Sequence, residues 1–241
     1  NFMLQKQLGG GFTGQVGYVA TRSTKQLGYF DYNAGQVIGA GRNGQPYFQQ
    51  FGRFARTAAV TPVGNSKYDS LQATLNRRFA GGVKVDFAYT WSKAMGVCGI
   101  TNSDNNPCIQ YLPALHLNSA LMGFDPTHNF QSTFLAELPF GRGKRWASEG
   151  FASKLFGGWQ MNGLFSAYTG TPFSVTSSGN SLNLPGSSQN ADLVKPEVKK
   201  IGNVGRGQAY YDWTAFAPVT TPRFGTAGFN ILRGPELINL D

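Results

Sequence analysis

The stretch "YDSLQATLNRRFAGGVKVDFAYTWSK", from Tyr68 to Lys93, decides the fold. Apolar and polar residues alternate along both of its arms, which is the period-two pattern of a β-strand. The "AGG" sequence at 80–82 lies between the arms and predicts a tight turn, because glycine adopts positive φ angles without steric cost. Each arm covers about 11 residues, roughly twice the usual strand length. The stretch therefore predicts a long antiparallel hairpin.

The two faces of this hairpin differ in an unusual way. One face is apolar, and the other is polar but carries few charges. A tilted strand needs about 9–11 residues to cross a bilayer, which matches the length of each arm. These features favour strands that cross a membrane, with the apolar face toward lipid and the polar face toward a wet lumen.

The same alternation recurs along the chain. Besides the hairpin, the segments that we expect to be strands are 1–8, 13–20, 128–140, 159–169 and, at the end of the chain, "ELINLD" at 236–241. The joins between strands alternate in length. The shorter joins are 9–11, 80–82 and 141–158, and the longer ones are 22–66, 94–127 and 170–235.

Long loops without secondary structure count against a compact soluble domain. Outer-membrane barrels instead combine short periplasmic turns with long extracellular loops. We therefore predict an all-β fold, an antiparallel transmembrane β-barrel segment of about six to seven long strands. The soluble alternative is a β-sandwich, in which the apolar faces pack in a protein core.

The parity of each strand predicts which side chains face the lumen and which face lipid. The expected lumen-facing residues are Ser70, Gln72, Thr74, Asn76, Lys84, Asp86, Thr90, Gln131, Glu137, Gln160 and Asn162. The expected lipid-facing residues are Leu71, Leu75, Val83, Val85, Phe87, Tyr89, Trp91, Phe130, Phe134, Trp159 and Phe165. Asp86 and Glu137 are expected to form ion pairs across the wall, with Lys84 or Arg78.

The composition agrees with a β structure that has many turns. Only 14% of residues are charged, well below the quarter that is typical of soluble domains, while 32 of 241 residues are glycine. No apolar run approaches the ~18 residues of a membrane-spanning helix. The net charge is +9, but the basic residues are scattered and accompany no recognition-helix pattern, so no nucleic-acid partner is expected.

No set of residues predicts an enzyme, a cofactor or a metal site. Gly39, Gly41 and Gly44 fit G-x-G-x-x-G, but Pro46 follows and no helical start or ribose-binding acid is present. His116 and His128 each lie alone in the sequence. These residues are better explained as loop or strand-end positions.

Two further features leave alternatives open. Cys98 and Cys108 could form a loop disulfide in an oxidising compartment, or remain two thiols. The first long loop holds an aromatic patch, in which ligand contact and packing against the rim are the alternatives. This patch consists of Tyr47, Phe48, Phe51 and Phe54, with Arg53 among them.

The longer motifs resemble the Oar-like family of TonB-dependent receptors. They are "GQVGYVATRSTKQL" (14–27), "KYDSLQATLNRRFAGGVKVDFAYTWSKAMG" (67–96), "DPTHNFQSTFLAELPFGRGKRW" (125–146), "LFGGWQMNGLFSAYTGTPFSV" (155–175), "YYDWTAFAPV" (210–219) and "FGTAGFNILRGPELINLD" (224–241). The resemblance covers nearly the whole chain in the family's order. Asn129 departs from it, because an arginine is expected after the histidine.

The resemblance implies a section of an outer-membrane transporter that takes up a large extracellular substrate. Residues 1–241 would be a partial barrel domain, truncated at both ends, without the plug and amino-terminal domain through which such receptors engage the TonB complex. The implied partners are outer-membrane lipid, the TonB complex and an unknown substrate. Two alternatives stay open: an outer-membrane porin or structural barrel, and a secreted β-rich binding or adhesion protein.

Overall fold

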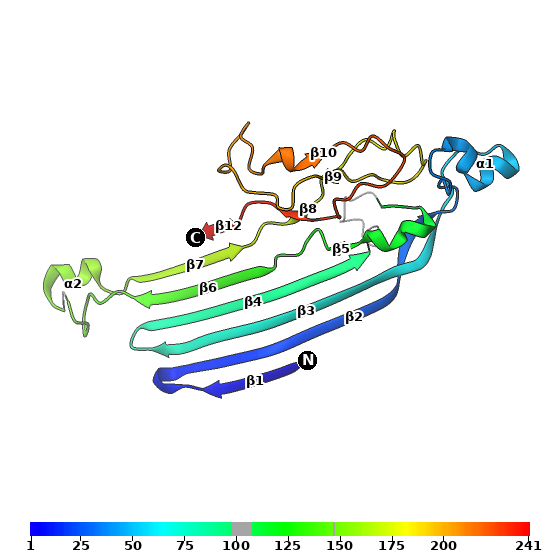
Figure 1. The fold of residues 1–241 in the computed structure, drawn as a ribbon. Helices are drawn as coiled ribbons and strands as arrows, with labels where there is room; N and C mark the ends of the chain where they lie inside the picture. The colour runs from blue at the N-terminus through cyan, green and yellow to red at the C-terminus, as the bar shows by residue number, and fades with distance from the viewer. Residues whose placement is uncertain (98–107, 147) are drawn as a thin grey trace.

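The computed structural model describes residues 1–97, 108–146 and 148–241. One large antiparallel sheet dominates it, with the long loops gathered at one end (Figure 1). The strand order is β1-β2-β3-β4-β6-β7-β12, and β5 also pairs with β4. These strands are β1 (Phe2–Gln7), β2 (Phe12–Asp31), β3 (Ala58–Ala80), β4 (Val83–Val97), β5 (Ser119–Leu121), β6 (His128–Glu137), β7 (Gln160–Tyr168) and β12 (Leu237–Leu240).

The hairpin that decides the fold is β3–β4. Its turn contains Gly81 and Gly82, both with positive φ angles (61° and 81°), which explains the choice of glycine. Leu71 lies opposite Trp91, so the predicted alternation is in register across the pair. A β-bulge between Arg77 and Ala80 ends this regular alternation just before the turn.

The first two long strands extend further than the sequence predicted. Both ends of the expected loop 22–66 are strand, because β2 continues to Asp31 and β3 begins at Ala58. Only 32–57 connects them, and it contains η2 (Gly41–Gly44) and α1 (Pro46–Phe51). Pro62 and Gly64 lie inside β3, and residues of this kind normally indicate turns.

The two ends of the sheet carry connections of different length. At one end lie η1 (Gly9–Gly11), the turn at 81–82 and the 138–159 join with α2 (Gly150–Phe156). The opposite end holds the long connections, including η3 (Leu112–Asn118). The loop at 170–235, which was expected to be structureless, contains two small ladders and a short helix. One ladder pairs β8 (Pro172–Phe173) with β11 (Leu232–Arg233), and the other pairs β9 (Asp192–Leu193) with β10 (Phe216–Ala217). The helix is η4 (Trp213–Ala215).

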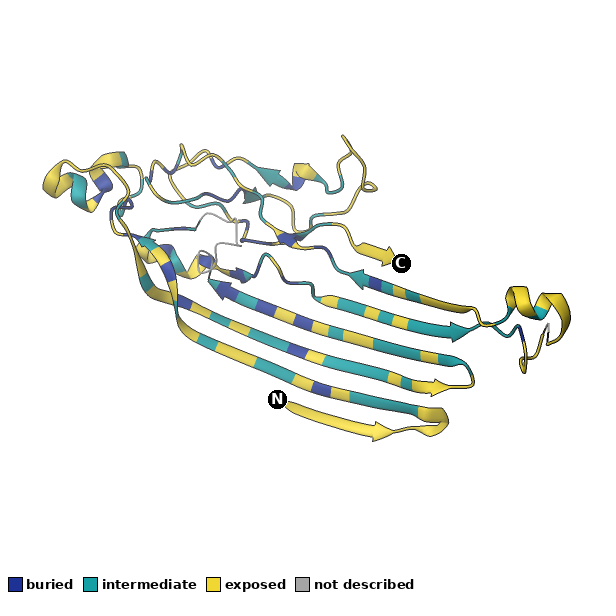
Figure 2. Ribbon diagram, turned by 180° about the vertical axis from the view of Figure 1, so that it is seen from behind, coloured by how far each residue is buried: buried dark blue, intermediate teal, exposed yellow. Residues whose placement is uncertain are grey.

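The buried core of the described residues lies in the loops rather than in the sheet. Figure 2 shows the strands as mostly intermediate or exposed, with few buried positions. An apolar cluster of Ile109, Ala114, Ala120 and Phe229 joins connections that are distant in sequence. No helix in the described part of the chain is long and apolar enough to cross a membrane. The all-β, antiparallel fold class is confirmed, and the sheet is open, with β1 and β12 as its edges.

Candidate functional site: two sheet faces and a loop cap

The strand register divides the sheet into two chemically different faces. The apolar face is the one that carries Leu71, and the polar face is the one that carries Ser70. The register extends this division across β2, β6 and β7. Within the ladders, every residue predicted to face lipid lies on the apolar face, and every residue predicted to face the lumen lies on the polar face. That lipid covers the apolar face stays a prediction.

Trp159 is the one predicted lipid-facing residue outside a ladder. It lies directly before β7, and its indole N–H donates to the backbone carbonyl of Leu155 at 3.0 Å. The side chain is 61% exposed. It therefore lies at the short-turn end of the sheet, where an aromatic residue would meet a membrane interface.

Paired residues on the apolar face form rows across the strands. One row contains Tyr18, Leu71, Trp91 and His128, and the next row toward the loops contains Asp69 and Lys93. Tyr89 lies one row nearer the short turns. Its hydroxyl and Nδ1 of His128 share a hydrogen bond of 2.8 Å. Aromatic side chains thus separate the apolar band from charged residues, as at a membrane interface.

The apolar band has a length suited to a bilayer. Along β3 it runs from Arg77, near the short turn, to Asp69, near the loops. Eight residue steps of roughly 3.3 Å cover about 26 Å along the strand. At a tilt of about 40° this spans about 20 Å of membrane, close to the ~25 Å apolar band of outer-membrane barrels.

Ion pairs on the polar face run along strands or to a turn. Lys84 Nζ lies 3.2 Å from the Asp86 carboxylate, and both belong to β4. Thr133 Oγ1 on β6 donates to the same carboxylate at 3.4 Å. Lys144, from the 138–159 join, pairs with Glu137. The expected pairing of Asp86 with Lys84 therefore occurs within one strand, and Glu137 takes a partner that the sequence did not suggest.

The loop cap is the set of connections 32–57, 108–127 and 169–236 at the other end of the sheet. Asn33 is fully buried in it, and its side-chain amide donates to the carbonyls of Arg53 and Ala55 at 2.9 Å each. Its side-chain oxygen accepts from Tyr47 N. Gln45 donates to the Asn33 carbonyl at 2.8 Å. These bonds fix the connection 32–57 as a folded unit rather than a flexible loop.

The three connections are also bonded to one another. Gly35 N donates to the Pro185 carbonyl at 2.7 Å, and Gly39 N donates to the Leu182 carbonyl at 3.0 Å. Gln110 N donates to Ser187 Oγ at 3.0 Å. Leu182 has no exposed surface, so it anchors an interior formed between the loops. The loop cap therefore behaves as one packed body.

The predicted aromatic patch lies on and after α1. Phe51 and Phe54 are 74% and 60% exposed, while Tyr47 packs against Phe51 with ring centroids 6.1 Å apart. Arg42 lies over the Phe54 ring at 4.8 Å. Arg53 points its Nε toward Thr57 Oγ1 at 2.9 Å. The patch also includes Phe48, the fifth of its predicted members. The rings of Phe51 and Phe54 stay mostly exposed despite these contacts, so packing accounts for only part of the patch.

A buried ion pair that the sequence did not suggest ties the loop cap to the sheet. Arg233 Nη2 lies 2.7 Å from the Asp125 carboxylate, whose side chain has no exposed surface. Asp125 also accepts from Ala94 N on β4 at 2.6 Å, and from Thr127 Oγ1 at 2.9 Å. Arg233 donates further to the Gly170 carbonyl. Asp125 begins the family-like motif at 125–146, and nothing in that motif indicates Arg233 as its partner.

Ion pairs on the surface of the loop cap shift the acidity of two carboxyl groups. Hydrogen bonds from Lys195 and Thr214 lower the pKa of Asp212 from 3.8 to about 2. A two-pronged contact with Arg223 lowers the pKa of Asp192 below its usual value. These ion pairs connect the region of β9, which includes Asp192 and Lys195, with the region of β10, which lies between Asp212 and Arg223.

The remaining predicted positions divide between described and undescribed parts of the chain. The predicted disulfide involves Cys98, which lies outside the described residues, so the pairing with Cys108 stays a prediction. Gly39 lies just before η2, Gly41 and Gly44 are its first and last residues, and His116 lies in the last turn of η3. The described residues hold no group of three or more His, Cys, Asp or Glu side chains that could bind a metal ion.

Comparison with known proteins gives one family. No curated protein and no solved structure matches the chain. The model of a family described as "Outer membrane beta barrel domain" matches residues 1–241, the whole sequence. The match agrees with long antiparallel strands, an apolar face of bilayer length and long loops at one end only. The chain therefore belongs to the outer membrane beta barrel domain family, and its place is the outer membrane.

Proposed function

We propose that this domain is part of the barrel wall of a TonB-dependent transporter of the Oar-like type, which takes up a large substrate. The observation that carries the proposal is the loop cap, a packed body built from three connections at one end of the sheet. Such a body presents a fixed binding surface, whereas scattered loops would not. The polar face beneath it, with Gln131 and Asn162, suits a water-filled interior.

The loop cap lies outside the cell in this proposal, because long loops are extracellular in barrels of this kind. Phe51 and Phe54 have the most exposed aromatic rings of the 32–57 connection and are proposed to contact the substrate. Exposed aromatic side chains with a neighbouring arginine are common at binding hot spots. Arg42 and Arg53 supply that cationic neighbour.

The open sheet requires further strands in this proposal. β1 and β12 each leave one edge unpaired, and unpaired backbone groups are not tolerated in hydrocarbon. Barrels of large transporters close with about 22 strands around a plug. We propose that strands from outside residues 1–241 complete the wall, and that a plug and a TonB-binding segment belong to the same protein.

The alternative within the same family is an open porin or structural barrel. The secreted binding or adhesion protein loses support, because the family is one of the outer membrane. We propose no enzymatic role for this domain. A TonB-dependent transporter has a plug and is coupled to TonB, whereas a porin or structural barrel has neither. The barrel wall itself does not distinguish the two functions.

The deciding experiment uses the whole outer-membrane protein that contains this domain. A TonB-dependent transporter should bind the purified periplasmic domain of TonB and should show little conductance in a planar bilayer. A porin should give stable open channels and no TonB binding, and that result would overturn the proposal.

The orientation is tested separately by labelling intact cells with a membrane-impermeant maleimide. In a background with both native cysteines changed to serine, Phe51→Cys on α1 should react. Lys154→Cys on α2 should react only after the outer membrane is permeabilised. The reverse pattern would show that the loop cap faces the periplasm.

A further inference from the structure

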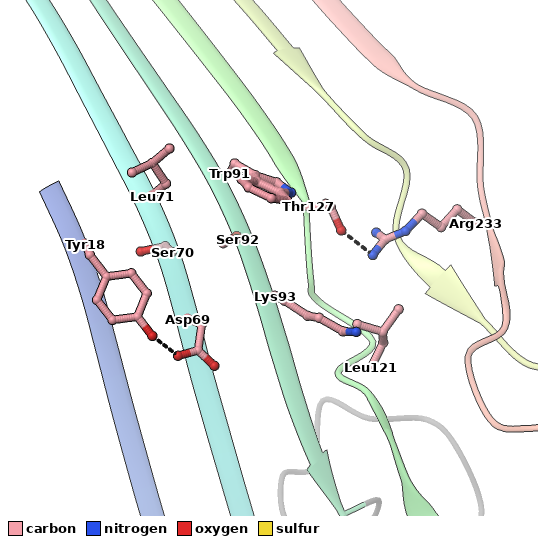
Figure 3. Close-up of a pocket in the computed structure, with 10 residues that line it drawn as sticks. All are labelled: Tyr18, Asp69, Ser70, Leu71, Trp91, Ser92, Lys93, Leu121, Thr127 and Arg233. Carbon is pink, nitrogen blue, oxygen red and sulfur yellow. Dashed lines mark hydrogen bonds between the residues drawn. The ribbon is translucent and has the colours of Figure 1, made fainter. Parts of the chain in front are cut away.

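We propose that the apolar face binds a phosphorylated lipid of the outer leaflet, at the end of the sheet next to the loop cap. The site is a hollow of about 610 Å³. Figure 3 shows Trp91 and Lys93 side by side on β4, with Tyr18 on one side and Leu121 and Arg233 on the other. The inference goes beyond transport, and it rests on the extracellular position of the loop cap proposed above.

The hollow exists because β4 changes its partner at this level. Pairing with β6 ends at Trp91, and pairing with β5 begins at Met95. Between them, Ala94 N bonds to the Asp125 carboxylate instead of a strand. Met122 N and the Thr127 carbonyl still bond to β4, so only the residues between them depart from the ladder, and the hollow lies beside this break.

The walls of the hollow are suited to hydrocarbon. Leu71, Trp91 and Leu121 contribute apolar surface, and the first two are 42% and 54% exposed in the protein alone. A lipid chain lying there would remove that surface from water at roughly 25 cal/mol per Å². Trp91 and Tyr18 also belong to the aromatic row, which places the hollow at the level of lipid headgroups.

The charges around the hollow favour a phosphate. Lys93 lines the hollow, and Arg22 and Lys67 lie one row farther toward the loops on the same face. The only carboxylate among them is Asp69, which binds Arg22 at 2.7 Å and accepts from the Tyr18 hydroxyl. Three cations against one carboxylate leave an excess of +2. Lys67 and Lys93 are exposed and form no ion pair with any described residue.

A phosphorylated lipid explains both halves of this site together. Lysine side chains at a membrane surface attract anionic headgroups with about 1 kcal/mol each. A free phosphate would use the two lysines but would leave the apolar hollow unexplained. A neutral lipid would fill the hollow but would leave Lys67 and Lys93 unpaired. The occupant that accounts for both features is an outer-leaflet lipid that carries phosphate on its headgroup, as the diphosphoryl form of lipid A does.

The test measures lipid binding to the whole outer-membrane protein in mild detergent by native mass spectrometry. Diphosphoryl lipid A is compared with its dephosphorylated form. Lys93→Gln should raise the Kd for the diphosphoryl lipid roughly 5-fold, and the Lys67→Gln/Lys93→Gln double variant roughly 25-fold. Lys93→Arg should keep the wild-type affinity, because it keeps the charge.

The matched control is Lys6→Gln, which removes a lysine from the same face near the short-turn end. It should leave lipid binding unchanged. Equal Kd values for the double variant and the wild type, or equal binding of the two lipid forms, would overturn the proposal. A failure of the orientation alone would appear in the cell-labelling experiment, while this binding in detergent would remain.

Discussion

The sheet and the loop cap are stabilised in opposite ways. On the sheet, large apolar side chains such as Leu71, Trp91 and Leu240 remain about half exposed or more. In the loop cap, Leu182, Asn33 and Asp125 are fully buried, and the polar ones are bonded. The sheet therefore relies on its backbone ladders and on the surrounding lipid. The loop cap relies on an interior of the kind found in water-soluble proteins.

One chain therefore combines a sheet suited to lipid with a loop cap suited to water. A polar substitution should be harmful on the apolar face and harmless on the polar face. The removal of a buried bond should be harmful only in the loop cap. The expected effects below test that division, beginning with the largest.

The largest effect is expected for Asp125→Ala. The substitution leaves Arg233 half-buried without its partner and frees the Ala94 amide, which should cost about 3–5 kcal/mol in the loop cap. Asp86→Ala removes the exposed Lys84 pair on the polar face and should cost about 0–1 kcal/mol. Hydrogen exchange of residues 232–236 and of β4 measures both. Similar exchange in the two variants would contradict the contrast.

A charge at mid-height on the apolar face should have the next largest effect. Ala73→Arg lies midway between Arg77 and Asp69 on β3, so it should destabilise the inserted domain by about 2–4 kcal/mol. Thr74→Arg, the next residue, lies on the polar face and should change stability by less than about 0.5 kcal/mol. Urea unfolding in lipid vesicles gives both values. If Thr74→Arg proved the more harmful, the faces would be assigned the wrong way round.

Acid should loosen one part of the loop cap. The pKa of Asp212 is lowered to about 2 in the folded protein, so its contacts contribute stability in full above about pH 4. That contribution is lost as the pH falls through about 2. Pepsin cleavage within 192–215 should therefore rise between about pH 4 and pH 2. Asp212→Asn should weaken this pH dependence and leave the part that comes from the Asp192–Arg223 pair, and the β4 backbone should stay protected throughout.

The smallest effect on stability is expected in the aromatic patch. The Phe51→Ala/Phe54→Ala double variant removes mostly exposed rings and should change unfolding by no more than about 0.5 kcal/mol. If the patch contacts substrate, uptake by the whole transporter should fall several-fold. The matched control is Phe156→Ala on α2, whose ring is comparably exposed at the other end of the sheet. Unchanged uptake would remove the patch from the proposed site.

The alternation of apolar and polar residues predicted the strands well where the two faces of the sheet lie in different environments. Between Val83 and Trp91, and along β6 and β7, side chains divide between two environments, and period two is enforced. Near the loop cap, residues on both faces of β2 and β3 are exposed. The segment around Pro62 and Gly64 therefore carries no alternation, and its strand was missed.

The loop cap could not be predicted because its bonds join distant residues. Nothing near Asn33 indicates that it will bond to Arg53, and nothing near Asp125 names Arg233. The aromatic patch was found because composition alone marks it, although its helix was not. Side-chain hydrogen bonds to backbone depend on the folded path of the chain, and a single sequence does not reveal that path.

The irregularities near the loop-cap end of the β2–β3 pair divide this hairpin into two parts, a long regular ladder and a shorter stem. The register shifts between Ser23 and Gly28, where Lys25 has a φ of 56°, just beyond the row that contains Arg22. Bulges bend a strand and increase its twist locally. The shorter stem beyond these shifts, 26–31 paired with 58–64, can therefore point in another direction than the regular ladder from Phe12 to Ser23. A change in the direction of this stem leaves the pairing of the longer ladder unchanged.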